Sequence, residues 1–178
     1  MIVVGLGNPG RRYAGTRHSV GFMIVDRLVK DLGGRPWRSE FGVRWSKVGP
    51  HWIIKPWEFM NHSGPALKRF MAAKRLGFTT ANMAESLIVI HDDVDFPIGT
   101  ERLVHQRTSA GHRGVQSIID TFGTKEFDRL RIGIGDNRAA GLPAEAYVLQ
   151  LFSRAERPVI EQSLHQAVEL VKSRLGVT

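Results

Sequence analysis

The sequence predicts a single α/β domain over residues 1–178, built as a three-layer sandwich in which helices cover both faces of a mixed, mostly parallel sheet. Short apolar runs with the character of buried strands alternate along the chain with stretches whose apolar residues recur at helical spacing. The 178 residues, with 42% hydrophobic content and no repeat, low-complexity tract or linker, suit one domain with a well-formed core.

The first predicted elements are a strand and a helix joined by a glycine-rich loop. Met1 to Val4 is apolar and indicates a short buried strand. Thr16 can cap a helix that begins near Arg17 and stops at Gly33-Gly34. The apolar face of this helix is expected to contain Val20, Ile24, Leu28 and Leu32. His18 then lies in the first turn of the helix, beside the loop.

A hairpin and a second helix are expected next. Phe41 to Val48 and His51 to Lys55 are strand-like and meet across Gly49-Pro50. After a loop, Ser63 can cap a helix that runs to about Arg75. The inner face of that helix is expected to carry Leu67, Phe70 and Met71. Four tryptophans are interpreted as packing and surface groups of the hairpin: Trp37, Trp45, Trp52 and Trp57.

The second half of the chain continues the alternation. Strands are expected at residues 86–90, 100–104 and 127–134. One helix should follow the polar loop 106–111 and end near Phe122, and a loop is expected at 136–143. The last helix is expected from about residue 155 to 175. Its apolar positions 160, 164, 167, 168, 171 and 175 keep helical spacing.

Composition narrows the class of protein. A formal net charge of +8 indicates a polyanionic partner. The absence of Cys excludes disulfides and thiolate metal sites and agrees with a cytoplasmic location. No run of about 18 apolar residues predicts a membrane span, and no signal peptide is expected at the N-terminus.

The glycine-rich loop admits three interpretations. Gly5, Gly7 and Gly10 fit G-x-G-x-x-G, the fingerprint of dinucleotide-binding proteins. That motif needs a helix opening on the glycines and an acidic residue about 20 positions on, and here the helix starts later and Pro9 interrupts the motif. A tight turn beside a surface histidine is the second interpretation. A hydrolytic site that uses Asn8 and His18 is the third.

Polar loops at strand ends favour the hydrolytic site. In an open α/β sheet, loops at the carboxyl ends of strands share one crevice. The loops concerned are residues 8–18, 59–61, 91–95 and 109–114. Together they offer a histidine that can take a proton from water, a carboxylate that can orient it and amides that can position a carbonyl. No serine stands in a G-x-S-x-G turn, so a covalent acyl-enzyme is not expected.

A metal site is the competing interpretation of the cluster His91, Asp92, Asp93 and Asp95. Alternate residues of an extended chain point apart, and the segment after Val94 indicates a turn. Asp95 is therefore expected to be an exposed turn residue, and no metal is expected.

Taken together, the motifs closely resemble those of bacterial-type peptidyl-tRNA hydrolases. They occur in the order and spacing of that family and cover nearly the whole chain. The matching blocks are Gly5-Leu6-Gly7-Asn8-Pro9-Gly10, Tyr13, Thr16-Arg17-His18, Gly21, Phe59-Met60-Asn61, Ser63-Gly64, His91-Asp92-Asp93-Val94-Asp95, Pro97, Gly99, Gly111-His112-Arg113-Gly114 and Arg129 to Gly135.

The resemblance implies an enzyme that cleaves the ester joining a peptide to the 3′ ribose of tRNA. It assigns His18 as the general base, Asp92 as the acid that holds the imidazole, and Asn8 as a group that tells blocked from free aminoacyl ends. The residues that it assigns to substrate binding are Tyr13, Phe59, Met60, Asn61, His112 and Arg113. It implies no metal or organic cofactor, and the positive charge would serve tRNA phosphates near the acceptor stem and 3′ end.

Two departures from the family pattern stand out. Arg113 occupies a position where the family usually has Asn, and an Arg donates hydrogen bonds but cannot accept them. A contact with the 3′-terminal nucleotide is less expected there, whereas a phosphate contact, aided by Arg102 and Arg107, is favoured. The family's common C-terminal extension is expected to be absent, since the sequence stops at Val177-Thr178.

We therefore expect a monomeric, metal-independent peptidyl-tRNA hydrolase in the cytoplasm, with no obligatory protein partner and no membrane contact. The alternative is a non-catalytic RNA-binding relative with the same fold. Joint retention of Asn8, His18, Asn61 and Asp92 favours the enzyme.

Overall fold

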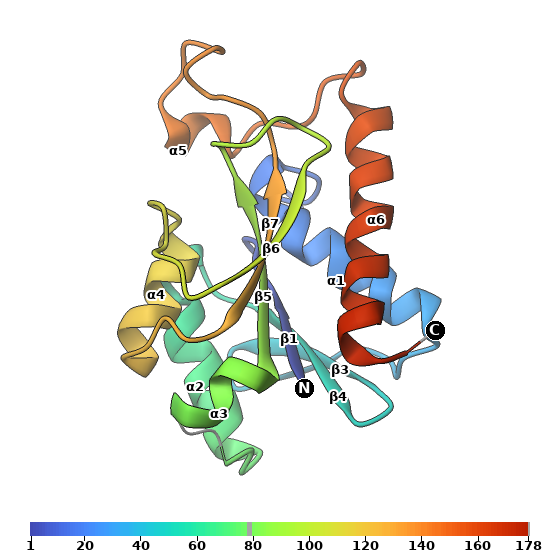
Figure 1. The fold of residues 1–178 in the computed structure, drawn as a ribbon, viewed down its shortest axis with the longest axis vertical. Coiled ribbons are helices and arrows are strands. Elements are labelled where there is room, and N and C mark those ends of the chain that lie inside the picture. Colours follow the sequence, from blue (N-terminus) through green and yellow to red (C-terminus); the bar gives the residue numbers. More distant parts are fainter. Residues whose placement is uncertain (78–79, 178) are drawn as a thin grey trace.

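One seven-stranded sheet forms the centre of the computed structural model, which describes residues 1–77 and 80–177 (Figure 1). The strands lie in the order β2-β3-β4-β1-β5-β7-β6. They are β1 Ile2–Gly5, β2 Arg38–Glu40, β3 Val43–Val48, β4 His51–Pro56, β5 Leu87–Asp93, β6 Glu101–His105 and β7 Asp128–Gly133. β4, β1, β5 and β7 are parallel, whereas β2, β3 and β6 pair antiparallel. The predicted mixed sheet with a parallel centre is confirmed.

Helices cover both faces of this sheet (Figure 1). α1 Val20–Asp31 and α6 Arg157–Leu175 pack on one face. α2 Ser63–Ala73, α3 Thr80–Ser86 and α4 Arg113–Phe122 pack on the other. The short elements are the 3-10 turns η1 Arg17–Ser19 and η2 Met60–His62 and the helix α5 Ala144–Tyr147.

The central strands feed two cores because successive side chains of a strand point to opposite faces. Val3 packs with α1 and α6, while Ile2 and Val4 pack with α2 and α4. A strand buried on both faces needs apolar residues without alternation, which explains the continuous apolar runs in the sequence. All six predicted apolar positions of the last helix are buried: Ile160, Leu164, Ala167, Val168, Val171 and Leu175.

The aromatic side chains of the hairpin pack among themselves, as expected. Trp45 lies 5.1 Å from Trp52 between ring centroids, and both contact Phe70. Trp57 stacks on Phe22 at 5.7 Å, and Arg44 covers its ring.

The expected side-chain caps at two helix starts were wrong. α1 begins at Val20, after η1, and the Thr16 hydroxyl donates to the Tyr13 carbonyl oxygen at 2.8 Å instead of capping the helix. Ser63 is the first residue of α2, and its hydroxyl donates to the Met60 carbonyl oxygen at 2.8 Å. In both cases the hydroxyl satisfies a nearby backbone group of a tight turn, which competes with capping.

Short elements were missed. β2, α3 and α5 are too short to show a periodic pattern. β5 also runs on through Asp93, past the expected end at Ile90, because His91, Asp92 and Asp93 pair with β7.

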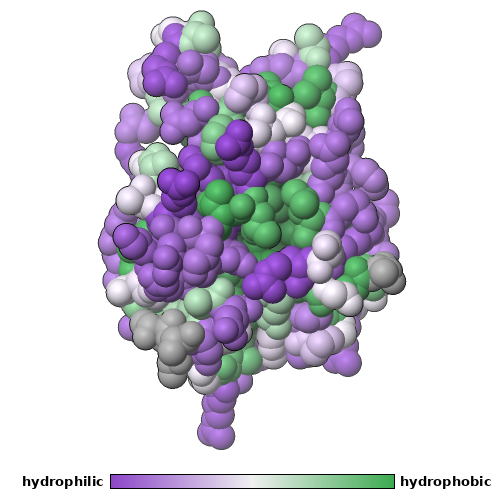
Figure 2. Space-filling model, in the orientation of Figure 1, coloured by the Kyte–Doolittle hydropathy of each residue, from purple (hydrophilic) through white to green (hydrophobic). Residues whose placement is uncertain are grey.

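The surface in the view of Figure 2 is mostly hydrophilic, with an apolar patch near its middle. β6 lies there in Figure 1, and its Leu103 is exposed. In the described part of the chain, no helix is long and apolar enough to cross a membrane.

Candidate active site

The four predicted loops do meet at one cavity, of about 410 Å³, at the carboxyl ends of β1 and β5. Asn8, His18 and Asp92 line it, together with residues 59–61 and 109–113. α1, which follows β1, packs on one face of the sheet and α2, which follows β4, on the other. The cavity thus lies where chain connections diverge, the usual place for a site in an open α/β sheet.

Two glycines bring His18 to this edge of the sheet. A Cβ atom on Gly5 would lie 2.2 Å from the Gly21 carbonyl oxygen, and one on Gly21 would lie 2.4 Å from the Leu6 nitrogen. A Cβ atom on Gly7 would likewise lie 2.7 Å from the nearest atom of the Phe22 ring. These glycines let the first turn of α1 press against β1, a packing role that replaces the dinucleotide interpretation.

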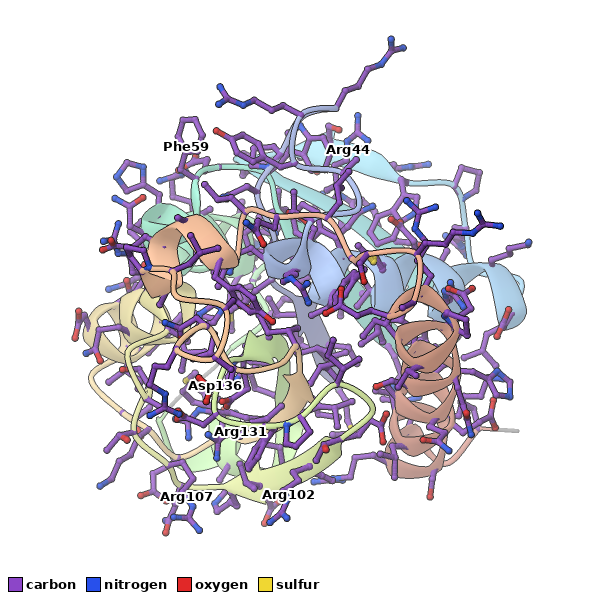
Figure 3. All side chains as sticks on the ribbon, turned by 90° about the horizontal axis from the view of Figure 1, so that it is seen from above. Arg44, Phe59, Arg102, Arg107, Arg131 and Asp136 are labelled. Carbon is purple, nitrogen blue, oxygen red and sulfur yellow. The ribbon has the colours of Figure 1, made fainter. Side chains whose placement is uncertain are left out.

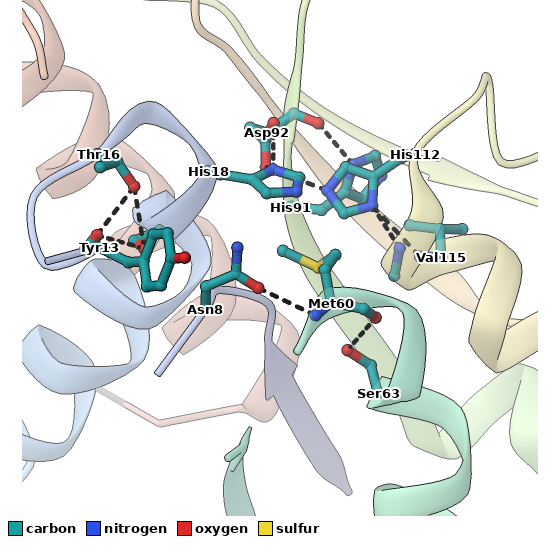
Figure 4. A network of polar contacts seen from close by, with 12 residues as sticks. Asn8, Tyr13, Thr16, His18, Met60, Ser63, His91, Asp92, His112 and Val115 are labelled. Carbon is teal, nitrogen blue, oxygen red and sulfur yellow. Dashed lines mark hydrogen bonds and ion pairs between the residues drawn. The ribbon is translucent and has the colours of Figure 1, made fainter. Parts of the chain in front are cut away.

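His18 and Asp92 form a tight pair. The His18 Nδ1 lies 2.9 Å and 3.0 Å from the two carboxylate oxygens of Asp92 (Figure 4). Both side chains are shielded from solvent, with exposed fractions of 13% and 3%. Because an ionised carboxylate only accepts, Nδ1 carries the proton and Nε2 keeps its lone pair. Nε2 makes no hydrogen bond within the described residues, so it is free to accept a proton from a substrate water.

The surroundings set the charge of this pair. Burial by itself lowers the pKa of His18, but the charge and hydrogen bond of Asp92 outweigh burial and the opposing Arg113, and the pKa lies above its ordinary value. Burial would raise the pKa of Asp92, yet the charges and hydrogen bonds of His18 and His112 hold it well below its usual range. Asp92 is therefore an ionised partner that favours the protonated form of His18.

Asp93 also lines the cavity, but the carboxylates of Asp93 and Asp95 have partners other than His18. The Asp93 carboxylate accepts from the Arg131 Nε at 2.5 Å and from the Asp95 N–H at 3.0 Å. Asp95 is exposed, as expected. The proposed metal alternative with His91, Asp93 and Asp95 is thus not assembled in the described residues.

A different trio comes close to metal-site geometry. Possible ligand atoms of His18, Asp92 and His112 all lie within 4.8 Å of one another. However, the His112 Nδ1 accepts from the N–H groups of Gly114 and Val115 at 3.2 Å and 3.3 Å. Its Nε2 therefore carries the ring proton, which it donates to Asp92 at 3.0 Å. A metal on Nε2 would have to displace that proton, so the hydrogen bonds favour a proton network over a cation site.

His91 adds a third imidazole to the network. Its Nδ1 lies 2.7 Å from the Asp92 backbone oxygen, and its ring meets that of His112 at 4.8 Å. Burial, with the nearby His112, lowers the pKa of His91 to about 3. His91 is thus a neutral packing group behind the His18–Asp92 pair.

The Asn8 amide has a defined orientation. Its Oδ1 accepts from the Met60 backbone N–H at 2.9 Å, so its NH₂ group is the end that faces the cavity (Figure 4). Met60 is itself buried and packs closely against Gly114, where a Cβ atom would lie 2.4 Å from the Met60 sulfur. Asn8 therefore offers a fixed donor beside His18.

The other predicted substrate residues surround the cavity. Phe59 is 58% exposed and, with Asn61, lines the rim. Tyr13 lies outside the cavity lining and packs edge-on against Phe59 at 6.4 Å. Arg113 is exposed at the cavity mouth and forms an ion pair with Glu145 of α5.

The three arginines expected around the start of α4 differ in surroundings. The Arg102 guanidinium lies 5.0 Å from the centroid of the Phe96 ring, and Arg131 lies over the same ring. Figure 3 shows Arg102 and Arg107 at one edge of the molecule and Phe59 at the opposite edge. Arg113 alone of the three lines the cavity.

Sequence reasoning missed the α5 segment, whose residues form one wall of the cavity: Ala144, Glu145, Val148 and Leu149. The backbone N–H of His18 donates to the Val148 carbonyl oxygen at 2.8 Å, which connects this wall to η1. Arg17 is buried beneath it, bound to Glu156 at 2.8 Å and 2.9 Å and lying over the Tyr147 ring at 4.5 Å. No local sequence signal indicated this wall, because the burial of Arg17 depends on the fold.

Comparison with known proteins gives a consistent picture. A family model described as peptidyl-tRNA hydrolase matches residues 2–177. A peptidyl-tRNA hydrolase of Thermodesulfovibrio yellowstonii is 44% identical over 174 residues, covering 96% of this chain and 90% of the relative. One of Bacillus subtilis is 37% identical over 180 residues, covering 99% and 92%.

Solved structures are similar as well. The crystal structure of peptidyl-tRNA hydrolase from Acinetobacter baumannii superposes with a TM-score of 0.80 at 29% sequence identity. The match covers 96% of this chain and 86% of that one.

Proposed function

This chain belongs to the peptidyl-tRNA hydrolase family, hydrolases that act on the ester bond of peptidyl-tRNA, and we propose that His18 is its general base. The observation that carries the proposal is the buried His18–Asp92 pair with its free Nε2 at the cavity. The substrate is a peptide, or another N-blocked aminoacyl group, esterified to the 3′ ribose of tRNA, and hydrolysis recycles that tRNA for translation.

The reaction proceeds by attack of water. The His18 Nε2 takes a proton from a water molecule as its oxygen bonds to the ester carbonyl carbon, and the carbonyl oxygen becomes an oxyanion. Asp92 stabilises the imidazolium that forms. The Asn8 NH₂ group donates to the oxyanion or positions the carbonyl. When the tetrahedral intermediate collapses, the imidazolium returns the proton to the departing 3′ oxygen, and free tRNA and peptide result.

The cavity suits both parts of the substrate. Its volume of about 410 Å³ falls within the range for small-molecule sites, and Phe59, Met60 and Leu149 give it apolar walls for peptide side chains. The net charge of +8 supports electrostatic attraction of tRNA. Arg113, at the mouth, would hold a backbone phosphate near the acceptor end after exchanging its exposed partner Glu145.

We further propose that residues 1–178 act as one domain, as a monomer in the cytoplasm, without a metal or organic cofactor. The hydrogen bonds support metal independence alone, since His18 Nδ1 and His112 Nε2 both direct ring protons at Asp92.

The decisive experiment is turnover of N-acylated aminoacyl-tRNA, with free aminoacyl-tRNA as the comparison substrate. We expect release of the N-acyl amino acid from N-acylated aminoacyl-tRNA at a rate that depends on enzyme concentration. Tight tRNA binding without release would favour the alternative, a non-catalytic RNA-binding relative.

A further inference from the structure

Every polar atom of the His112 side chain is engaged inside the protein. Nδ1 accepts from the first free N–H groups of α4, at Gly114 and Val115. Nε2 donates to the Asp92 Oδ1 at 3.0 Å. Only 7% of the side chain is exposed. His112 therefore has no polar atom left for a hydrogen bond to substrate, although its ring lines the cavity.

These contacts fix which ring nitrogen of His112 accepts and which donates. Nδ1 has to accept, because the two N–H groups at the start of α4 would otherwise be unsatisfied donors. The ring therefore points its Nε2 proton at Asp92.

We propose that His112 is a positioning residue for the reaction: it ties the Asp92 carboxylate to the first turn of α4 and so fixes the position of His18. This inference rests on the proposed function, since it concerns the same base. Asp92 lies near the carboxyl end of β5, between His91 and Asp93, and its Oδ1 is shared by His18 and His112 (Figure 4). With two donors from two elements, the carboxylate cannot swing without breaking a contact.

The shared oxygen also divides the carboxylate's charge between two donors. Two charged groups act on His18: Asp92 from β5, and Arg113 from α4, which is paired with Glu145 of α5. His91 packs against the His112 ring. Asp92 and Arg113 stay in place when a variant removes the His112 N–H donor. Asp92 would then hold the His18 proton more strongly, and the pKa of His18 should rise.

Two variants separate the cap from the contact with Asp92. His112→Asn keeps a side-chain oxygen suited to cap α4, but its amide is too short to reach Asp92. His112→Gln can reach Asp92 with an N–H donor but is a poor cap. Both are compared with wild type by the pH profile of kcat/KM, by NMR titration of the His18 ring in the free enzyme, and by thermal unfolding.

The inference predicts that His112→Asn lowers kcat/KM about tenfold, close to the low end for loss of a group that orients a functional side chain. In His112→Asn, the acid limb of the kcat/KM profile and the titration midpoint of the His18 ring should both move to higher pH. In His112→Gln, both should stay nearer to the wild-type values, although this variant should unfold at a lower temperature. An unmoved midpoint and limb in His112→Asn, or losses that follow unfolding temperature alone, would overturn it. The NMR midpoint does not depend on turnover, so the inference can fail while the proposed function stands. If the His18→Ala variant instead turned over substrate at the wild-type rate, the proposed function would be overturned.

Discussion

Two histidine–carboxylate pairs of nearly equal geometry lie at opposite ends of the sheet. His18 Nδ1 is 2.9 Å from Asp92, and His105 Nδ1 is 2.9 Å from Asp128. Asp92 stands at the carboxyl end of β5, whereas Asp128 begins β7. Distance alone therefore does not distinguish a reactive pair from a structural one.

Their surroundings do. The His105 side chain is 42% exposed. Its partner Asp128 also accepts a hydrogen bond at 3.0 Å from the Nε of Arg174, a permanent cation near the end of α6. Asp92 is buried, and among the described residues its side chain has only imidazole partners, one of which, His18, lines the cavity. Low exposure, a free Nε2 and an adjacent cavity suit the first pair to catalysis, whereas the second pair links β6, β7 and α6.

The largest expected difference comes from removing each base. His18→Ala should lower kcat/KM by about 10²–10⁴-fold, the usual contribution of a positioned general base. Folding and tRNA binding should stay close to wild type. His105→Ala serves as the matched control and should keep kcat/KM within about twofold, since an exposed pair contributes little beyond stability. Equal losses in the two variants would abolish the distinction.

Removing each carboxylate should separate the pairs by pH dependence. Asp92 raises the pKa of His18, and only the neutral ring can accept a proton. In Asp92→Asn the pKa falls, so the acid limb of kcat/KM should move to lower pH, with a loss of about 10- to 100-fold at the plateau. The pH profile of Asp128→Asn should be unmoved. An unchanged limb in Asp92→Asn would mean that Asp92 does not control His18.

Removing the Asp128 carboxylate should lower the stability of the fold. Asp128 accepts from both His105 and Arg174 with little exposure. Asp128→Asn should lower the free energy of unfolding by about 1 kcal/mol, because charge-assisted hydrogen bonds are weakened while one acceptor remains. Urea unfolding measures this, and turnover of the folded variant should match wild type.

The smallest effect is expected at the rim. Arg113→Ala should raise KM for many tRNAs alike with a smaller change in kcat, and should flatten the plot of log affinity against log salt by about 0.7–0.9. Glu145→Gln removes the competing anion and should strengthen binding without flattening the plot. Identical slopes for wild type and Arg113→Ala would leave Arg113 without a phosphate contact.

Much of this arrangement could be predicted from sequence because it depends on local patterns. Apolar runs predicted the central strands, and His18 and Asp92 stood out as polar groups at strand ends. The resemblance to a family, rather than spacing, assigned their roles.

The rest depends on contacts between distant segments. Nothing near His112 in sequence indicates that its ring would bridge α4 and Asp92, 20 residues away. The wall of the cavity at Glu145 and Val148 belongs to a four-residue helix without a periodic pattern. Asp128 and His105 pair only because β6 and β7 are antiparallel neighbours. Such pairings follow from the packed fold, which single-sequence patterns do not specify.

The most direct test of the account compares two titrations of the wild-type enzyme. The acid limb of kcat/KM for N-acylated aminoacyl-tRNA reports the pKa of the free enzyme's essential base. NMR titration of the His18 ring, assigned with His18→Ala, gives the pKa of that residue alone. The account predicts that the two midpoints coincide and that both lie above the ordinary histidine value. A kinetic limb that departs clearly from the His18 midpoint, or matches that of His105, would contradict it.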